Sequence, residues 1–330
     1  MKEPKILILR LSSIGDIVLT SPVPRCLRKA YPNARIHYAT KKGNRSILEH
    51  NPYIDRIHLL DQSVSELIAE LRKEEFDYII DLHHNLVTKR IKRALKATSS
   101  SFHKLNIEKF LLVAFKIPLQ EHHIVPRYLA TGSFLGIKDD GEGLDYYIAP
   151  AERVNPDSLP EAFRNGYIGI SVGAQHATKC LPKTKMIELC SLIDAPIILM
   201  GGPEDSDLAE EVILSLPEKP IFNACGKYSL NQSASLVEQS KLMIAHDTGL
   251  MHIAAAFGKN ILSVWGNTVP ELGMTPYKAG SESRIFEIKQ LKCRPCSKIG
   301  SASCPKKHFG CMQQQNCHAI AALANELFRR

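Results

Sequence analysis

Short apolar segments alternate with amphipathic segments along most of the chain, and this alternation is typical of a parallel α/β protein. The first half contains four apolar segments that suit buried strands, with helical segments between them. The second half contains five more. The predicted strands are residues 5–11, 35–40, 56–61, 76–82, 167–172, 195–200, 220–224, 242–245 and 260–264.

A stretch rich in glycine and proline, residues 139–165, separates the two halves. We therefore expect two Rossmann-like domains: residues 1–155, and residues 156–330 with a cysteine-containing tail and a terminal helix. Each would be a doubly wound parallel sheet. Such domains would place ligands in a cleft between them, at the carboxyl ends of their strands.

The most informative stretch is residues 241–268, which reads as strand, tight turn, helix and strand. The turn is His246-Asp247-Thr248-Gly249, and His252 follows one helical turn later. Backbone N–H groups and the helix dipole converge at such a turn and favour an anion. Helix capping explains one of these polar residues but not the cluster. We therefore predict an anion site at the start of this helix.

The turn after the first strand carries Ser12, Ser13, Gly15 and Asp16. A single glycine here rules out the G-x-G-x-x-G dinucleotide fingerprint, and the chain has no G-x-x-x-x-G-K-[ST] phosphate loop. Nicotinamide-linked and P-loop chemistry are therefore not expected. Asp16 has two interpretations that the spacing leaves open: a helix cap, or a base that accepts a proton from a substrate hydroxyl.

Two further turns in the second half place polar residues at the ends of predicted strands. Thr178 and Lys179 could contact a phosphate, although a solvated lysine is the simpler alternative. Glu204 could accept hydrogen bonds from a ribose diol, or could serve only as an acidic residue in a first helical turn. All these positions share one sheet edge, which favours a common site.

The charge of the chain favours anionic partners, with a formal net charge of +8 and a pI near 8.9. A basic run between residues 89 and 109 suits a solvated helix face or a phosphorylated lipid headgroup. Aromatic residues do not alternate with these charges, so no nucleic-acid partner is predicted. The sequence has no apolar run long enough to span a bilayer. We expect a cytoplasmic protein whose only membrane contact is peripheral.

The C-terminal tail contains Cys293, Cys296, Cys304 and Cys311. The lone C-x-x-C pair lacks a second pair at zinc-ribbon spacing. A structural zinc site is an alternative that we do not favour, and free thiols are the simpler expectation.

Four segments together resemble the lipopolysaccharide heptosyltransferase family, the inverting glycosyltransferases of family nine. They are RLSSIGDIVLTSPV, GAQHATKCLP, MGGPEDS and HDTGLMHIAAAFGKNILSVWG, and the similarity covers essentially the whole chain. The chain departs from the family at Leu181-Pro182, where Trp-Pro is common. The resemblance implies a GT-B fold that transfers a sugar, most simply heptose from ADP-heptose, without a metal or other cofactor. It also implies a lipopolysaccharide core or another phosphorylated glycolipid as the acceptor, reached by peripheral contact with the inner membrane.

The resemblance also implies roles for individual residues. Asp16 would be the general base on the acceptor side, with Ser12, Ser13 and Gly15 in the same turn. The residues expected to bind the donor are Thr178, Lys179, Glu204, Asp247, Thr248, Gly249, Leu250 and His252.

Two alternatives stay open at this point. A GT-B enzyme with a uridine or guanosine donor would use the same kind of site. A two-domain protein that binds an anionic ligand without catalysis would also need a cleft, but it would give Asp16 no role.

Overall fold

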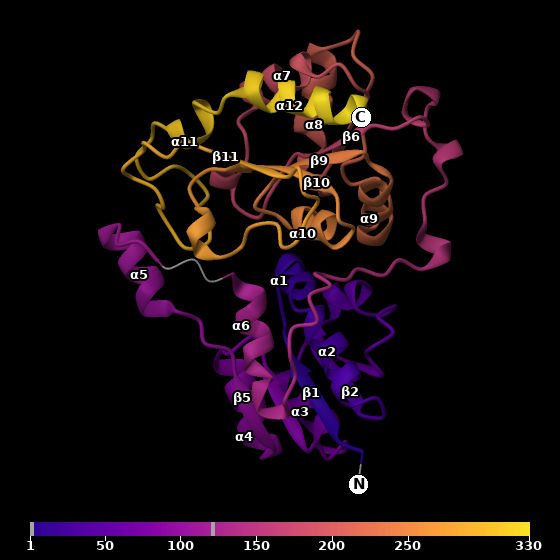
Figure 1. Ribbon diagram of the computed structural model, residues 1–330, viewed down its shortest axis with the longest axis vertical. Coiled ribbons are helices and arrows are strands. Elements are labelled where there is room, and N and C mark those ends of the chain that lie inside the picture. Colours follow the sequence, from indigo (N-terminus) through magenta and orange to yellow (C-terminus); the bar gives the residue numbers. More distant parts are fainter. Residues whose placement is uncertain (1–2, 120–122) are drawn as a thin grey trace. The chain divides into compact units, whose positions relative to one another are not determined.

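The computed structural model describes residues 3–119 and 123–330 (Figure 1). The chain forms two compact units. Unit 1 combines Met1–Leu105 with His122–Tyr147, and unit 2 combines Asn106–Glu121 with Ile148–Arg330. One short segment from the first half of the sequence therefore groups with the second unit.

Each unit is built on a parallel sheet whose strand order reverses once. The order is β3-β2-β1-β4-β5 in unit 1 and β11-β10-β9-β6-β7-β8 in unit 2, and all strand pairs are parallel. These are the strand orders of Rossmann-like sheets, and they confirm the fold class. The strands are β1 (Lys5–Leu9), β2 (Arg35–Lys41), β3 (Arg56–Leu60), β4 (Tyr78–Asp81), β5 (Thr98–Ser101), β6 (Ile168–Ser171), β7 (Ile197–Met200), β8 (Ile221–Asn223), β9 (Leu242–His246), β10 (Asn260–Trp265) and β11 (Arg284–Glu287).

Helices connect the strands in both units. Unit 1 contains α1 (Ile14–Leu19), α2 (Pro22–Ala30), α3 (Val64–Arg72), α4 (Leu86–Leu95) and α6 (Ile124–Thr131). Unit 2 contains α5 (Asn106–Phe115), α7 (Lys183–Leu192), α8 (Ser206–Ser215), α9 (Leu230–Gln239), α10 (Gly249–Ala256), α11 (Gly310–Gln313) and α12 (Cys317–Arg329).

The central strands are buried on both faces, as their uninterrupted apolar sequences require. In unit 1, Leu7 and Leu9 of β1 pack with Ile79 of β4. In unit 2, Ile170 of β6 and Ile244 of β9 belong to the larger core, which α12 also covers. Removing this apolar surface from water stabilises the sheets and fixes the loops at their carboxyl ends.

Two helices, rather than one of the single helical segments expected between strands, connect β1 to β2. Thr20 ends α1, and α2 begins at Pro22, whose ring suits a first helical position but lacks the N–H that a helix interior needs. The break leaves α1 as a short separate helix whose first turn carries Asp16.

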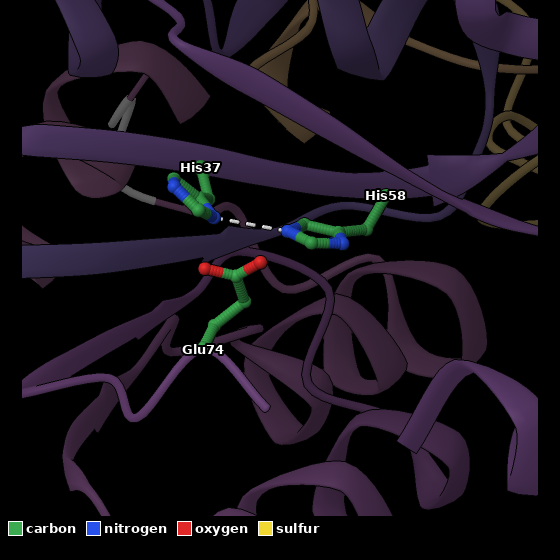
Figure 2. A group of neighbouring side chains, drawn as sticks. All are labelled: His37, His58 and Glu74. Atoms are coloured by element: carbon green, nitrogen blue, oxygen red, sulfur yellow. Dashed lines mark hydrogen bonds between the residues drawn. The ribbon is translucent and has the colours of Figure 1, made fainter. Parts of the chain in front are cut away.

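Two buried histidines link neighbouring strands of unit 1 (Figure 2). His37 Nδ1 lies 2.9 Å from His58 Nε2, and Glu74 completes a group close enough to hold a metal ion. However, Lys5 and Arg56 already pair with the Glu74 carboxylate, and their positive charges oppose a bound cation. Burial, together with the neighbouring His58, lowers the pKa of His37 to about 4. We therefore interpret the pair as a neutral structural network.

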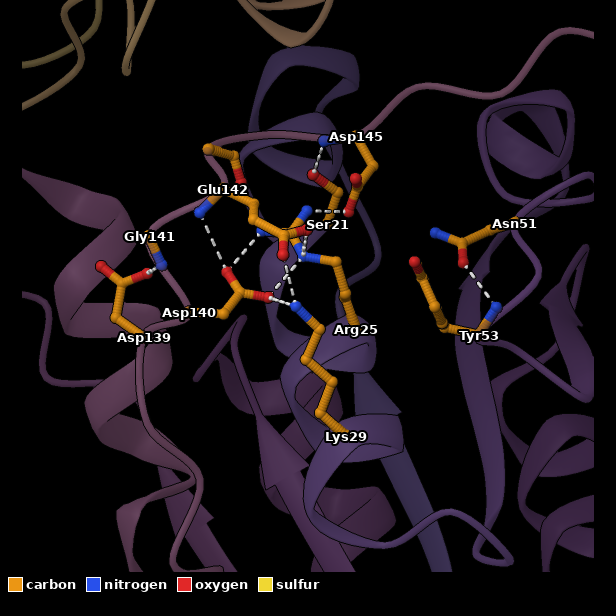
Figure 3. Close-up of polar contacts among 11 residues, drawn as sticks. Ser21, Arg25, Lys29, Asn51, Tyr53, Asp139, Asp140, Gly141, Glu142 and Asp145 are labelled. Carbon is orange, nitrogen blue, oxygen red and sulfur yellow. Dashed lines mark hydrogen bonds and ion pairs between the residues drawn. The ribbon is translucent and has the colours of Figure 1, made fainter.

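A buried arginine attaches the last segment of unit 1 to α2 (Figure 3). Arg25 donates from Nε and Nη2 to the two carboxylate oxygens of Asp140, at 2.7 and 2.9 Å. The same guanidinium donates to the carbonyl of Gly143 at 2.8 Å and pairs with Asp145. Hydrogen bonds from Arg25 hold the pKa of Asp140 well below its usual range. Charge pairing thus fixes the segment that leaves the unit.

Candidate functional site

The turn after β1 brings Asp16 beside Arg10. Asp16 is in the first turn of α1, and Ser13 donates to its Oδ2 from the hydroxyl at 2.9 Å and from the amide at 3.3 Å. The capping role left open by the sequence is therefore present. In addition, Asp16 Oδ1 lies 2.7 Å from Arg10 Nη2, so the carboxylate belongs to an ion pair as well. Ser12 and Gly15 lie in the same turn.

Arg10 is fixed by the backbone on both sides of the point where the strand order reverses. Its Nε donates to the Ser12 carbonyl at 2.7 Å, and its Nη1 donates to the Leu82 carbonyl at 2.6 Å. Ser12 follows β1 and Leu82 follows β4, the two strands at which ligands bind in open α/β sheets. Burial opposes the charge of Arg10, but Tyr128 and Asp16 raise its pKa above the ordinary value.

Three other groups interact with this ion pair. The Tyr128 hydroxyl of α6 lies 3.3 Å from Asp16 Oδ1. Burial and the charges of Arg10 and Lys104 lower the pKa of His83 to about 4, so this imidazole is neutral at pH 7. Burial and Arg10 also lower the pKa of Lys104. A carboxylate among cationic and neutral donors can orient an anionic substrate and accept a proton from its hydroxyl.

The second reversal point lies between β6 and β9 in unit 2. The Ser171 hydroxyl, at the end of β6, lies 3.4 Å from the Thr248 hydroxyl. Thr248 caps α10 and accepts the Met251 amide at 3.4 Å. Residues 242–246 and 251–255 are buried, whereas residues 247–250 are partly exposed. The start of α10, including Gly249 and Leu250, is therefore the accessible part of this unit of strand, turn and helix.

Asp247 does not cap the helix but forms an ion pair with Lys179. Lys179 Nζ lies 2.7 Å from Asp247 Oδ2, and both side chains are largely buried. The Thr268 hydroxyl, just after β10, donates to the same oxygen at 3.3 Å. Three loops that follow different strands thus meet at one carboxylate beside the start of α10. This arrangement can place an ammonium group and helix N–H groups on a diphosphate.

The remaining predicted donor residues occupy different surroundings. Thr178 is buried, and its hydroxyl donates to the Ser301 carbonyl at 2.9 Å and accepts the Ser301 amide at 2.8 Å. It therefore anchors the loop around residue 301. Glu204 is exposed in the turn before α8, close to Gly202. His252 is buried within α10.

Asp205 is a site residue that the sequence reasoning missed. Its Oδ2 accepts the Gly202 amide at 2.9 Å. A Cβ at Gly173 or at Gly201 would overlap the Asp205 carboxylate, so the turns after β6 and β7 meet at this side chain. Burial raises the pKa of Asp205, and the neighbouring Glu204 adds to this effect. The MGGPEDS segment contains this residue, but nothing in its spacing distinguishes Asp205 from Glu204.

His246, the last residue of β9, fixes the loop that carries Lys179. Its Nε2 accepts the Leu181 amide at 3.0 Å. Within the described part of the chain, its Nδ1 is buried without a hydrogen-bond partner. Burial lowers the pKa of His246 to about 4, so the imidazole is neutral and Nδ1 carries its proton.

The nine cysteines, all within the described residues, are free thiols. Cys293 Sγ lies 3.7 Å from His308 Nε2. Burial raises the pKa of Cys311 to about 11. The tail cysteines form no group of three closely spaced metal-ligand atoms in the described ranges.

The two Rossmann-like sheets have the architecture of the GT-B fold, which solved heptosyltransferase structures share. A family model described as glycosyltransferase family 9 (heptosyltransferase) matches residues 64–306. Because the match spans more than half of the chain, the protein belongs to this family and is a glycosyltransferase. The family resemblance and the enzyme class expected from the sequence are thereby confirmed.

Curated relatives and solved structures agree with this assignment. Lipopolysaccharide heptosyltransferase 1 of Campylobacter coli is 26% identical over 292 residues, which cover 80% of this chain and 84% of the relative. Lipopolysaccharide heptosyltransferase 3 of Escherichia coli is 25% identical, with 77% and 81% covered. A family 9 glycosyltransferase from Veillonella parvula superposes with a TM-score of 0.77 at 23% identity, covering 100% of this chain and 99% of that one. E. coli ADP-heptose lps heptosyltransferase II gives 0.69 at 21% identity, with 98% and 99% covered.

Proposed function

We propose that the enzyme transfers heptose from ADP-heptose to a lipopolysaccharide core acceptor. Curated relatives carry the names of lipopolysaccharide heptosyltransferases, and solved E. coli relatives are described with ADP and with ADP-2-deoxy-2-fluoro heptose. The observation that carries the proposal is the Lys179–Asp247 pair beside the accessible start of α10, because it suits a diphosphate linked to a sugar.

In this proposal unit 2 binds the donor. The Lys179 ammonium and the N–H groups of Gly249 and Leu250 contact the diphosphate, and Glu204 accepts hydrogen bonds from the ribose hydroxyls. Asp247 and Thr248 contact the diphosphate and the sugar, and His252 supports them from within α10. Thr178 acts through the loop that it anchors at Ser301.

The leaving group is the nucleoside diphosphate, and its charge grows as the glycosidic bond breaks. Lys179 and the dipole of α10 stabilise that charge where it develops. In other transferases a divalent cation stabilises the charge of the leaving diphosphate. We therefore propose that transfer needs no metal or other cofactor.

Asp16 is the proposed general base. It accepts the proton of an acceptor hydroxyl while the oxygen attacks the anomeric carbon from the face opposite the diphosphate, which inverts the configuration. An aspartate with an ordinary pKa of about 3.9 is a weak base, but the hydroxyl becomes acidic as the new bond forms. Arg10 and Ser13 hold the carboxylate in one orientation, and the turn with Ser12 and Gly15 places it at the end of β1.

The acceptor of this reaction is a phosphorylated glycolipid. Arg10, Lys104 and the neutral His83 provide donors and positive charge beside Asp16, which suits phosphate or carboxylate groups on the acceptor. Because such an acceptor is anchored in the inner membrane, the enzyme would contact that membrane peripherally.

Three experiments test the proposal. Calorimetry with ADP, UDP and GDP should show binding of ADP in preference to the other two, and tight binding of UDP without ADP would overturn the assigned donor. Incubation with ADP-heptose and truncated lipopolysaccharide, followed by mass spectrometry, should show addition of one heptose. Transfer should persist in EDTA, and activity that returns only with added Mg²⁺ would refute metal independence.

A further inference from the structure

Helix α5, labelled in Figure 1, carries apolar side chains that are exposed to solvent. Ile107 and Phe110 are three residues apart and are 73% and 54% exposed. Phe115, at the end of the helix, and Ile117, just beyond it, are 65% and 49% exposed. Exposed apolar side chains scattered singly are ordinary, but four within eleven residues form a concentrated patch.

The patch belongs to a helix that is attached to unit 2. Leu112 is buried against Val269 and Leu272. The Lys116 ammonium donates to the Val113 carbonyl at 2.8 Å and to the Pro295 carbonyl at 2.7 Å. These contacts fix one side of α5, so the exposed side is a defined surface of the unit.

The tail extends this surface. Lys298 Nζ donates to the Asn106 carbonyl, at the first residue of α5, at 3.0 Å. The next residue, Ile299, is 64% exposed. We call the set Ile107, Phe110, Phe115, Ile117 and Ile299 the α5 patch.

The two stretches of chain that carry the α5 patch are rich in lysine and poor in acidic residues. The sequence has no aspartate or glutamate between residues 288 and 325. The same stretch contains the exposed lysines Lys289, Lys292, Lys298, Lys306 and Lys307. Glu108 is the single acidic residue between residues 82 and 119. Exposed apolar side chains on lysine-rich segments complement an anionic lipid bilayer, where apolar side chains enter the acyl boundary and ammonium groups meet the phosphates.

We infer that the α5 patch and the exposed lysines of the same two stretches bind the surface of an anionic lipid membrane. The inference rests on the proposed function, because a lipid-linked acceptor places the reaction at such a surface. Among the residues that the structure describes, no helix is long and apolar enough to cross a bilayer, so the contact is interfacial. A short apolar face binds such an interface weakly, and nearby lysines supply the second attraction that stable binding needs.

Co-sedimentation of the full chain with vesicles tests the inference. The protein should sediment with vesicles of phosphatidylcholine and phosphatidylglycerol, but not with phosphatidylcholine alone, and binding should weaken in 0.5 M NaCl because salt screens the lysines. A double variant, Phe110→Ser with Phe115→Ser, should bind anionic vesicles about tenfold more weakly or worse. Leu214→Ser is the matched control, because Leu214 is 78% exposed on α8 outside the α5 patch, and it should bind as the wild type does.

Three results would overturn the inference: no binding of the wild type to anionic vesicles, equal binding to neutral ones, or unchanged binding of the double variant. If the wild type does not bind vesicles but self-associates, and the double variant abolishes this self-association, the α5 patch is instead an interface with a second copy of the chain. Circular dichroism confirms that the variants fold.

Transfer from ADP-heptose to a deacylated, water-soluble acceptor separates the two proposals. The double variant should keep this transfer activity. If the wild type itself does not transfer heptose to the soluble acceptor, the result counts against the proposed function and not against membrane binding.

Discussion

Arg10 holds Asp16 by an ion pair of 2.7 Å, while two other donor atoms of the same guanidinium bond backbone carbonyls after β1 and β4. The proposed base is thus oriented by a side chain that is itself fixed to both strands at the reversal point of the sheet. Sub-ångström placement of a reacting group affects catalysis strongly.

Replacing Arg10 should therefore impair transfer more than donor binding. Arg10→Met should lower kcat by roughly 10- to 100-fold, because Asp16 loses its orientation. The Kd for ADP should not change, since the proposed donor-binding residues all lie in unit 2. Arg10→Lys keeps the charge without the planar fork and should recover part of kcat. If Arg10→Met keeps the wild-type kcat in steady-state assays, Asp16 does not need Arg10 to orient it.

Lys179 should contribute mainly to diphosphate binding. Lys179→Met removes a charged donor and should weaken ADP binding by roughly 10- to 100-fold in calorimetry. Lys183→Met is the control, because Lys183 pairs with Glu211 at the surface, and its effect should be negligible. Equal affinities of the wild type and Lys179→Met would remove Lys179 from the donor site.

Gly173 should be intolerant of a side chain because Asp205 occupies the adjacent space. Gly173→Ala should lower the free energy of unfolding by about 1–3 kcal/mol, measured by denaturant titration. Adding Asp205→Ala should restore most of the loss, because it removes the overlapping carboxylate. Gly43→Ala, where a Cβ would meet no atom within 4 Å, serves as the control. If the effects of Gly173→Ala and Asp205→Ala on the free energy of unfolding are additive, the overlap with Asp205 does not cause the destabilisation by Gly173→Ala.

The buried histidines should make the protein less stable in mild acid. Burial lowers the pKa of His37 and His246 to about 4, so between pH 6.5 and about 4 the unfolded chain binds more protons than the folded one. Stability should fall as the pH decreases through this window, by at most roughly 3 kcal/mol for each histidine. Denaturant titrations at several pH values measure the slope. His246→Gln keeps an acceptor for the Leu181 amide and should reduce the slope, whereas an unchanged slope would argue against a neutral buried His246.

The sequence predicted the strands that build the two sheets because these strands are buried and apolar. It missed β5 and β11, whose sequences are TSSS and RIFE, because pairing with β4 and with β10, and not apolar character, makes them strands. It also missed α5, whose apolar residues are partly exposed. A local sequence pattern cannot predict these elements, because tertiary contacts determine the secondary structure that such segments adopt.

The candidate site was predictable in position more than in detail. The turns that carry Asp16 and Asp247 were identified from polar residues after apolar strands. The ion pairs were not, because Lys179 and Asp247 are 68 residues apart in the chain. Arg10 did leave a signal, a charged residue inside an apolar segment, and the structure explains it as the partner of Asp16. The roles assigned to the individual site residues stay predictions.

The most direct test of the account is the Asp16→Asn variant. It keeps the size of the side chain but cannot accept a proton as a carboxylate does. Transfer of heptose from ADP-heptose to a truncated lipopolysaccharide acceptor, followed by mass spectrometry, should fall by roughly 100-fold or more, while calorimetry should give an ADP affinity close to that of the wild type. Transfer at the wild-type rate by a correctly folded Asp16→Asn enzyme would contradict the central claim that Asp16 is the general base.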